Sequence, residues 1–400
     1  MLIGRKKDSI AEAYERGDHA ATLKLLQPLA DQGDAQAQYN LGKMYENGYG
    51  VAQDYKEAVK WYRLAADQGD AAAQNHLGLM YKNGQGVPQD YEEALKWYRL
   101  AAEHGYSYAQ NHLGLMYKNG QDVAQDYKGA VKLYRLVADQ GVAQAQFTLG
   151  AMYDKGQGVA QDYKEAVKWY RLAADQGDST AQYNLGAMYE NGYGIAQDYE
   201  GATKLYRLAA DQGDAAAQNH LGLMYKNGQG VPQDYEEAVK WYRLAADQGY
   251  SAAQYNLGAM YANSQGVAQD YQEALKLYRL AADQGVAQAQ FTLGAMYISG
   301  QGIPRDYKEA VKWWRLAAAQ GYSYAQIILG FMYEKGQSVA QDYVRAHMWY
   351  NLAASLSSGE VGNTATEVRN RVAAKMTSAQ IDQAQEMARR CLQSNYKDCD

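Results

Sequence analysis

Histidines recur at a fixed interval along the chain, a pattern that metal sites can share. His76 and His112 lie 36 residues apart, and His220 follows after three further intervals of the same length. Equivalent helices of neighbouring repeats stand roughly 8–10 Å or more apart, so two such rings would not easily reach one ion. No Asp or Cys recurs beside them. We therefore expect structural or ligand-contacting histidines, and we expect no metal and no other cofactor.

Two other patterns are similar to nucleotide-binding or catalytic motifs, and both are incomplete. The Gly-rich strings GQGVPQ and GYGVAQ lack a preceding strand and a Gly-Lys-Ser/Thr sequence, which favours helix terminators. Ser394 and Lys397 have the Ser-x-x-Lys spacing without a Ser-Asp-Asn or Lys-Thr-Gly partner. No nucleophile, acid or base recurs with a partner, so we predict that the protein is not an enzyme.

The two cysteines, Cys391 and Cys399, both lie in the last ten residues. They could form a disulfide that closes a small terminal loop in an oxidising compartment, or remain reduced in the cytoplasm. The apolar start, Met1 to Ile3, is followed at once by basic residues and is too short for a signal peptide. We expect a cytoplasmic protein from the sequence as written, and a periplasmic or secreted one if a leader is missing.

Repeated helices must position all of these residues. Leu41 and Gly42 form a Leu-Gly pair that recurs every 36 residues and marks nine units without an insertion. In each unit, apolar residues such as Ala37, Leu41 and Met44 recur at helical spacing, and a second such set follows a Gly-rich loop. Each unit is therefore predicted to be a helix pair, and the fold all-α.

The change of pattern at both ends predicts three parts. We expect an N-terminal capping helix pair in residues 1–36, nine repeats in residues 37–354, and C-terminal capping helices with a Cys-containing tail in residues 355–400. Capping segments cover the apolar faces that the first and last repeats would otherwise expose.

Residues with preferences for helix ends mark the expected boundaries. Gly48 follows the first helix of its unit, where a left-handed residue often ends a helix, and Asp54 can cap the start of the second. Near the C-terminus, Thr364 and Thr377 each precede a Glu or Gln by three residues. This spacing predicts capping boxes at the start of two further helices.

Glycines inside the helices and substitutions in the loops have structural implications. Gly42 lies within a predicted helix, where glycine costs about 0.5–1 kcal/mol relative to Ala, so its recurrence predicts close approach of a neighbouring helix or a tyrosine ring. Ser264, Ser338 and Asp122 replace loop glycines of other units. If these positions are left-handed, a side chain costs of the order of 1 kcal/mol, and we expect softer packing there.

Composition excludes several classes of partner. The net charge is −6 and the pI about 5.6, so the chain has no electrostatic footprint for nucleic acid. No stretch approaches the roughly 20 apolar residues of a membrane helix. We expect a monomer that binds a protein or peptide.

The string A-Q-x-x-L-G-x-M-Y-x-x-G-x-G-V-x-Q-D-Y-x-x-A-x-x-W-Y-R-L-A-A-D-Q-G resembles the Sel-one-like repeat family, whose 36-residue units are relatives of tetratricopeptide repeats. The resemblance extends from Ala37 to about Ala354. It implies a bacterial protein with a right-handed α/α superhelical solenoid that mediates protein contacts, often in envelope, stress or host-interaction pathways.

The first helix of each unit has a face that its own apolar residues leave free. In the related superhelices the first helices line the concave surface, so this face would form a ladder of aromatic rings and carboxamides that could bind an extended peptide. Alternatively, part of it packs against the adjoining helix and Asn bonds within the array. The expected binding residues are Tyr39, Asn40, Asn75, His76, Asn111, His112, Tyr183, Asn184, Asn219, His220, Tyr255 and Asn256.

Two functions fit these features. The first is a non-enzymatic protein-protein interaction scaffold that binds peptide segments or partner proteins on its concave face. The second is a regulatory or structural spacer subunit in bacterial envelope or stress pathways, whose role depends on the length of the array. Deleting a block of four units would separate them, because a scaffold would lose affinity and a spacer would lose reach.

Overall fold

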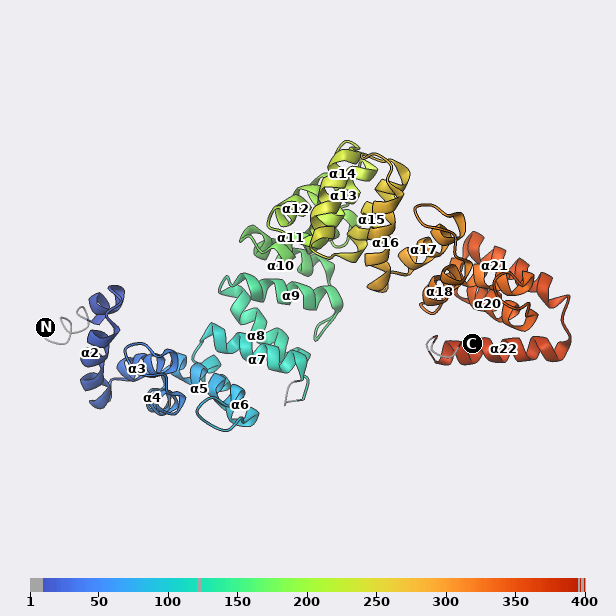
Figure 1. The fold of residues 1–400 in the computed structure, drawn as a ribbon. Helices are drawn as coiled ribbons and strands as arrows, with labels where there is room; N and C mark the ends of the chain where they lie inside the picture. The colour runs from blue at the N-terminus through green and yellow to red at the C-terminus, as the bar shows by residue number, and fades with distance from the viewer. Residues whose placement is uncertain (1–9, 121–123, 395, 397–398, 400) are drawn as a thin grey trace. The chain divides into compact units, whose positions relative to one another are not determined.

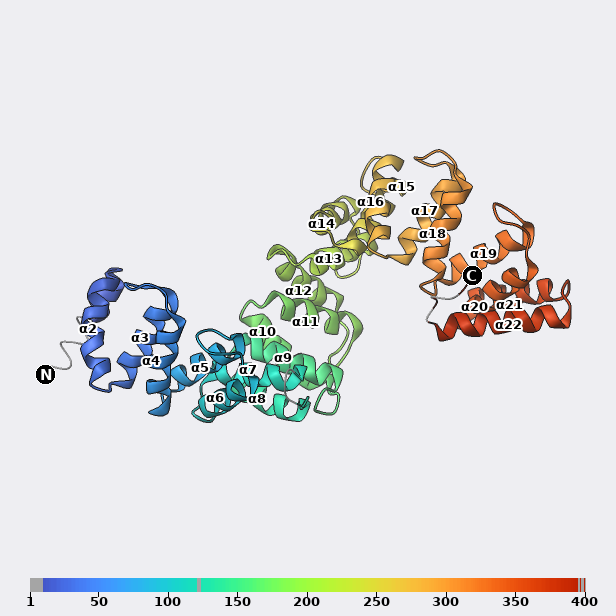
Figure 2. The ribbon, with the colours of Figure 1, turned by 60° about the horizontal axis from the view of Figure 1, so that its bottom comes forward.

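A computed structural model describes residues 10–120, 124–394, 396 and 399, and within these ranges the chain consists of helices and turns without a strand (Figure 1). It divides into two compact units, Met1–Gln197 and Asp198–Asp400. Within each unit, each helix packs against its neighbours in the chain, except that the last helix of the second unit packs on the helix two before it (Figure 2). The predicted all-α repeat fold is confirmed.

Each repeat contributes two helices joined by a loop. The first helices are α3 (Ala35–Asn47), α5 (Ala71–Asn83), α7 (Ser107–Asn119), α9 (Ala143–Lys155), α11 (Ser179–Asn191), α13 (Ala215–Asn227), α15 (Ser251–Asn263), α17 (Ala287–Ser299) and α19 (Ser323–Lys335). The second helices are α4 (Tyr55–Asp67), α6 (Tyr91–Glu103), α8 (Tyr127–Asp139), α10 (Tyr163–Asp175), α12 (Tyr199–Asp211), α14 (Tyr235–Asp247), α16 (Tyr271–Asp283), α18 (Tyr307–Ala318) and α20 (Tyr343–Leu356).

The expected end-of-helix residues of the repeats have their predicted roles. Gly48 ends α3 in the left-handed conformation, with φ of 73°. The Asp54 carboxylate accepts hydrogen bonds from the backbone N–H groups of Lys56 and Glu57, at 2.8 and 3.2 Å, and so satisfies donors that the first turn of α4 leaves free. Local sequence alone therefore places the helix boundaries within a repeat.

Gly42 allows a tyrosine ring to lie directly against α3. A Cβ atom at Gly42 would stand 2.7 Å from the Cδ1 atom of Tyr62, which is fully buried. The predicted close approach of a ring is confirmed, and it joins the two helices of the repeat at their centre.

Serine replaces glycine in two loops at backbone positions that favour glycine. Ser264 and Ser338 have φ of 55° and 62°, in the left-handed region that an L side chain enters at a cost of roughly 1–2 kcal/mol. The equivalent prediction for Asp122 lies outside the described residues. The expected softness of these loops stays a prediction.

Side chains that recur in each repeat tie it to the next. Arg99 Nη2 on α6 donates to the Tyr117 hydroxyl on α7 at 2.8 Å. Within the first repeat, Gln68 Nε2 donates to Gln38 Oε1 at 2.7 Å, and Gln38 in turn donates at 3.1 Å to the backbone carbonyl of Ala30 in the preceding helix. Equivalent Arg–Tyr and Gln–Gln pairs recur in both units, so neighbouring repeats are held in a constant register.

Helices outside the repeats cover the two ends. Helix α2 (His19–Asp31) packs on α3, and α21 (Gly359–Ala373) and α22 (Ser378–Gln393) pack on α20. Thr377 forms the predicted capping box with Gln380. The prediction for Thr364 is wrong, because α21 begins at Gly359 and Thr364 lies inside it.

The start of α21 lies close to the residues that join it to α20. Gly362 lies so close to the preceding turn that a Cβ atom there would stand 2.3 Å from the carbonyl oxygen of Ser357. The first turn of α21 therefore forms against the end of α20, upstream of the threonine. Among the described helices, none combines the length and apolar character needed to cross a membrane.

Candidate functional site

The predicted ladder lies on the first helices but is only partly open to solvent. None of its twelve residues is exposed, and Asn75 and Asn219 are buried, with 4% and 7% of their surface accessible. The other ten, Asn111 and Tyr183 among them, are half-buried. Neighbouring repeats cover part of each helix face, a contact that the projection of a single helix does not contain.

The first repeat shows how this covering arises. The ring of Tyr39 lies 5.9 Å from that of Tyr62 and 5.5 Å from that of His76 in the next repeat. The Tyr39 hydroxyl is 3.4 Å from His76 Nε2, and His76 Nδ1 is 3.3 Å from Glu46 Oε2. Tyr62 donates its hydroxyl to the same Glu46 oxygen. Four polar side chains thus meet at the contact between α3, α4 and α5.

This cluster changes the acidity of its members. Burial alone would raise the pKa of Glu46, but hydrogen bonds from His76 and Tyr62 outweigh it, and the pKa lies below its ordinary value. Burial raises the pKa of Tyr39 to about 12, and nearby negative charge adds to this effect. Glu46 is therefore a carboxylate and Tyr39 a neutral phenol at pH 7.

The other two ladder histidines have different surroundings. The ring of His112 meets that of Tyr98 edge-on at 5.2 Å, and burial together with the charge of Lys82 lowers the pKa of His112. His220 Nδ1 lies 3.0 Å from the carbonyl oxygen of Ala216. Across the described residues, no three His, Cys, Asp or Glu side chains are grouped so that they could hold a metal ion.

Several ladder residues of the second unit, and Asn184 of the first, bond within the array. Asn256 Nδ2 donates to Asn219 Oδ1 of the preceding repeat at 2.9 Å, and Asn184 Nδ2 donates to the carbonyl oxygen of Thr180 at 2.7 Å. The ring of Tyr255 lies 5.5 Å from that of Tyr278. These contacts correspond to the alternative in which asparagine bonds within the array.

Asn40 lies beside a pocket at the N-terminal end of the array. It lines a surface pocket of about 370 Å³ between the N-terminal helices and α3, together with Lys43 and apolar side chains that include Leu29 and Tyr49. Its side-chain oxygen accepts a hydrogen bond from Gln36 at 3.4 Å. Asn40 is thus a ladder residue beside a cavity.

The most exposed large side chains of the first helices occupy two other positions. Tyr108 is 68% exposed and Tyr324 is 51% exposed, and both stand at the position of Gln36. Seven residues further on, Leu115 and Phe331 are also exposed. Residues seven apart lie on one helix face, so each pair belongs to the same stripe as the ladder. The expected binding residues did not include these two positions.

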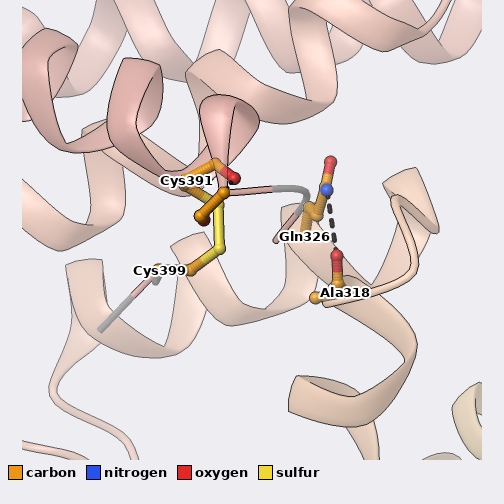
Figure 3. The surroundings of a disulfide bond; sticks show 5 residues. Ala318, Gln326, Cys391 and Cys399 are labelled. Carbon is orange, nitrogen blue, oxygen red and sulfur yellow. Dashed lines mark hydrogen bonds between the residues drawn. A yellow bond between two sulfur atoms is a disulfide. The ribbon is translucent and has the colours of Figure 1, made fainter. Parts of the chain in front are cut away.

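The two cysteines are joined. Figure 3 shows the disulfide between Cys391 at the end of α22 and Cys399, close to Gln326 of the last repeat. Gln326 Nε2 donates to the Ala318 carbonyl oxygen at 3.2 Å. Cys391 is fully buried, so the bond holds the chain end against the last repeat.

The sequence matches the model of the Sel1 repeat nine times in succession. The matches cover residues 35–70, 71–106, 107–142, 143–178, 179–214, 215–250, 251–286, 287–322 and 323–358.

Solved structures of bacterial proteins are similar. A protective antigen present in uropathogenic Escherichia coli strains, which displays an SLR fold, is 35% identical, with a TM-score of 0.89 over 99% of this chain and 86% of that one. A Sel1 repeat protein from Oxalobacter formigenes is also 35% identical, with a TM-score of 0.63 over 76% of this chain and 88% of its own. No functionally curated protein matches.

Helix pairs of 36 residues stacked in constant register define a right-handed α/α solenoid of the tetratricopeptide-like class. The chain belongs to the Sel1 repeat family. Proteins with such repeats are generally non-catalytic scaffolds for protein interactions.

Proposed function

We propose that this protein is an interaction scaffold that binds an extended segment of a partner protein on its first-helix surface. We define this surface as the side chains at the positions of Gln36, Tyr39, Asn40 and Lys43 in each repeat. The observation that carries the proposal is the exposure of Tyr108 and Leu115 on α7, and of Tyr324 and Phe331 on α19. Exposed aromatic side chains beside half-buried polar groups are characteristic of protein interfaces.

The second unit supports the proposal with a cluster of aromatic rings. The ring of Tyr322 lies 5.4 Å from that of Phe291 and 5.8 Å from that of Tyr324. The ring of Tyr324 is also 6.2 Å from that of Phe291. These rings fix one another in place, so binding an apolar side chain there would restrict few further rotamers.

The test compares the first-helix surface with the second-helix surface. Cross-linking pull-downs with mass spectrometry would use the whole chain and two double variants, Y108A with L115A and Y324A with F331A. The matched control replaces Leu136 and Leu280, which are exposed on second helices, by Ala. Partners should be lost from at least one first-helix variant and retained by the control, and equal retention by all three would contradict the proposal.

The constant register of the repeats favours a second function, that of a spacer subunit in the bacterial envelope or in stress pathways. The Arg–Tyr and Gln–Gln pairs repeat in the same way in both units, as a role based on length requires. Deletion of residues 107–250 removes four repeats in register. A scaffold would lose partner affinity, whereas a spacer would keep its affinity and lose reach.

We further propose that the protein acts as a monomer in an oxidising compartment outside the cytoplasm. The bond between Cys391 and Cys399 supports this, since disulfides persist where thiols are not kept reduced. The similar Escherichia coli protein is a protective antigen, which also fits an exported protein. Thiol alkylation of protein from its native cells, before and after reduction, should reveal both cysteines only after reduction. Light scattering would measure the molar mass in solution, which should equal the 44.4 kDa of one chain.

A further inference from the structure

Equivalent positions in the first and second repeats hold opposite charges beside the same tyrosine. In the first repeat, the Glu46 carboxylate accepts the hydroxyl of Tyr62 and lies 3.3 Å from His76 Nδ1. In the second repeat, Lys82 stands at the position of Glu46, Tyr98 at that of Tyr62, and His112 at that of His76. The donors of the first cluster thus recur without their carboxylate.

The second repeat and the helix that follows it hold buried polar atoms without partners. Tyr98 is 0% exposed and Asn75 is 4% exposed. Within the described part of the chain, the Tyr98 hydroxyl, Asn75 Oδ1 and His112 Nδ1 have no hydrogen-bond partner. A buried polar group left unpaired costs roughly 1–3 kcal/mol, so three at one contact need an explanation.

These atoms belong to one place in the structure. The rings of Tyr98 and His112 are 5.2 Å apart. The second unit contains an almost identical repeat, in which Asn219 corresponds to Asn75 and Asn256 of the following repeat corresponds to His112. There, Asn219 Oδ1 accepts a hydrogen bond of 2.9 Å from Asn256. By this equivalence, Asn75 lies next to His112. We call Asn75, Lys82, Tyr98 and His112 the α5–α7 polar cluster.

Exposed apolar side chains lie beside the α5–α7 polar cluster. Tyr108 and Leu115 are exposed on the helix face that carries His112, four residues before it and three after it. Their counterparts in the second unit are Ala252 and Ala259. Apolar contact area and unpaired buried polar atoms thus coincide only in the first of the two similar repeats.

We propose that the α5–α7 polar cluster binds the side-chain carboxylate of an Asp or Glu in an extended partner segment, a proposal that rests on the proposed scaffold function. The carboxylate takes the role that Glu46 has in the first repeat. It accepts hydrogen bonds from the Tyr98 hydroxyl and from His112 Nδ1–H, and Lys82 provides the opposite charge. A backbone N–H of the segment donates to Asn75 Oδ1, and a neighbouring apolar side chain packs on Tyr108 and Leu115.

The test measures binding of synthetic peptides to the full chain by fluorescence anisotropy. The first peptide is extended, has blocked ends and carries one Glu next to Leu. The second has Gln in place of Glu, and the third has Gln with a free C-terminal carboxylate. Variants Y98F, H112N and K82E are compared with the chain, and Y242F is the matched control, because it removes an unpaired buried hydroxyl from the similar repeat in the second unit.

The Glu peptide should bind at least about tenfold more tightly than the Gln peptide, as expected for hydrogen bonds to a charged group. Y98F should remove about tenfold of the affinity for the Glu peptide and leave that for the Gln peptide unchanged. H112N should also weaken binding, because it introduces the Asn–Asn pair of the second unit. K82E should abolish binding, since it supplies the carboxylate internally, and Y242F should have no effect.

Several results would overturn the proposal. These are equal affinities for the Glu and Gln peptides, equal losses in Y98F and Y242F, or no binding of any peptide. If only the third peptide binds, the ligand of the cluster is a C-terminal carboxylate and not a Glu or Asp side chain. The proposed scaffold function is tested by a different experiment. It would be contradicted if the pull-downs showed that neither the Y108A/L115A variant nor the Y324A/F331A variant loses a partner. Y98F removes an unpaired hydroxyl and should fold normally, which circular dichroism would verify.

Discussion

The first and last repeats place a glutamate at the same position and use it differently. In the first unit, the Glu46 side chain is 22% exposed and meets Tyr62 and an imidazole of the next repeat. In the second unit, the Glu334 side chain is 1% exposed and accepts hydrogen bonds from Tyr350, Arg371 and Lys375 at 3.2, 3.2 and 3.1 Å.

The difference teaches what a repeat needs from its neighbour. A carboxylate can be fully buried only where the adjoining element supplies charge and enough donors. Arg371 of α21 and Lys375, two residues after this helix, provide two cations for Glu334, whereas the second repeat offers Glu46 one histidine. At Lys82 the position carries no acid although His112 of the next repeat is present, and the Tyr98 hydroxyl has no partner. The side chain at this position can therefore bind the C-terminal helices, contact the next repeat, or leave the tyrosine hydroxyl without a partner.

Replacing the two glutamates by Ala should lower stability by clearly different amounts. Glu334→Ala should destabilise the packing of α21 and α22 on α20 by about 2–3 kcal/mol, because three hydrogen bonds to a buried charge are lost. Glu46→Ala should cost about 1 kcal/mol. Urea unfolding and hydrogen exchange of α21 and α22 would measure this. Glu309→Ala, which breaks an exposed pair with Lys312, is the control, and equal losses for Glu46 and Glu334 would refute the comparison.

The glycines beside the two tyrosines should respond alike. A Cβ atom on Gly42 or on Gly330 would stand 2.7 Å from Tyr62 or 2.6 Å from Tyr350. Gly42→Ala and Gly330→Ala should each cost about 1–3 kcal/mol through overpacking. Thermal unfolding would check this, and equal losses would show that the two ends differ in charge rather than in ring packing.

Acid should release the C-terminal helices through Glu334. Burial would raise its pKa, but hydrogen bonds from Lys375 and Arg371 outweigh this and hold the pKa below its ordinary value of 4.5. Because the folded pKa is the lower one, the stabilisation is complete above pH 4.5 and is lost as pH falls through the folded pKa. The protection of α22 amides, relative to their intrinsic exchange rate at each pH, should therefore fall below pH 4.5 in the unmodified chain, and Glu334→Gln should flatten this dependence. An unchanged pH profile in the variant would assign acid sensitivity to other groups.

The smallest effect should come from adding a glutamate where none occurs. Lys82→Glu gives the unpaired Tyr98 hydroxyl an acceptor and should stabilise the first unit by about 1 kcal/mol. Lys226→Glu should do the same for Tyr242 in the second unit. Urea unfolding would measure both, and no gain in either variant would mean that these hydroxyls already have a partner in solution.

Much of the fold was predictable because its causes are local. The spacing of Leu41 and Met44, the cap at Asp54 and the left-handed Gly48 act within one repeat, so the helix pairs follow from sequence. The Thr364 prediction was wrong because α21 begins five residues earlier, at Gly359, where Gly362 lies close to the carbonyl oxygen of Ser357. A capping preference marks a possible start of a helix and does not exclude an earlier one.

For the candidate site, the sequence predicts which face of the first helices is involved but not which residues on that face are accessible. Projection of one helix finds the stripe that holds Tyr39 and Asn75, but the neighbouring repeat decides how much of it stays accessible. Asn75 is buried for that reason, and Tyr108 remains exposed. Unpaired atoms such as the Tyr98 hydroxyl are visible only when the residues of three helices are placed together.

The pairs that join successive repeats also have a mechanical consequence. Arg99 with Tyr117, and Gln74 with the carbonyl of Ala66, link nearest neighbours, so a pulling force along a unit is carried by one such contact after another. Under tension, a repeat that gives way releases its own length of chain and leaves the next contact intact. Each unit would therefore extend in steps and recoil when the load is removed, as a series of small springs does.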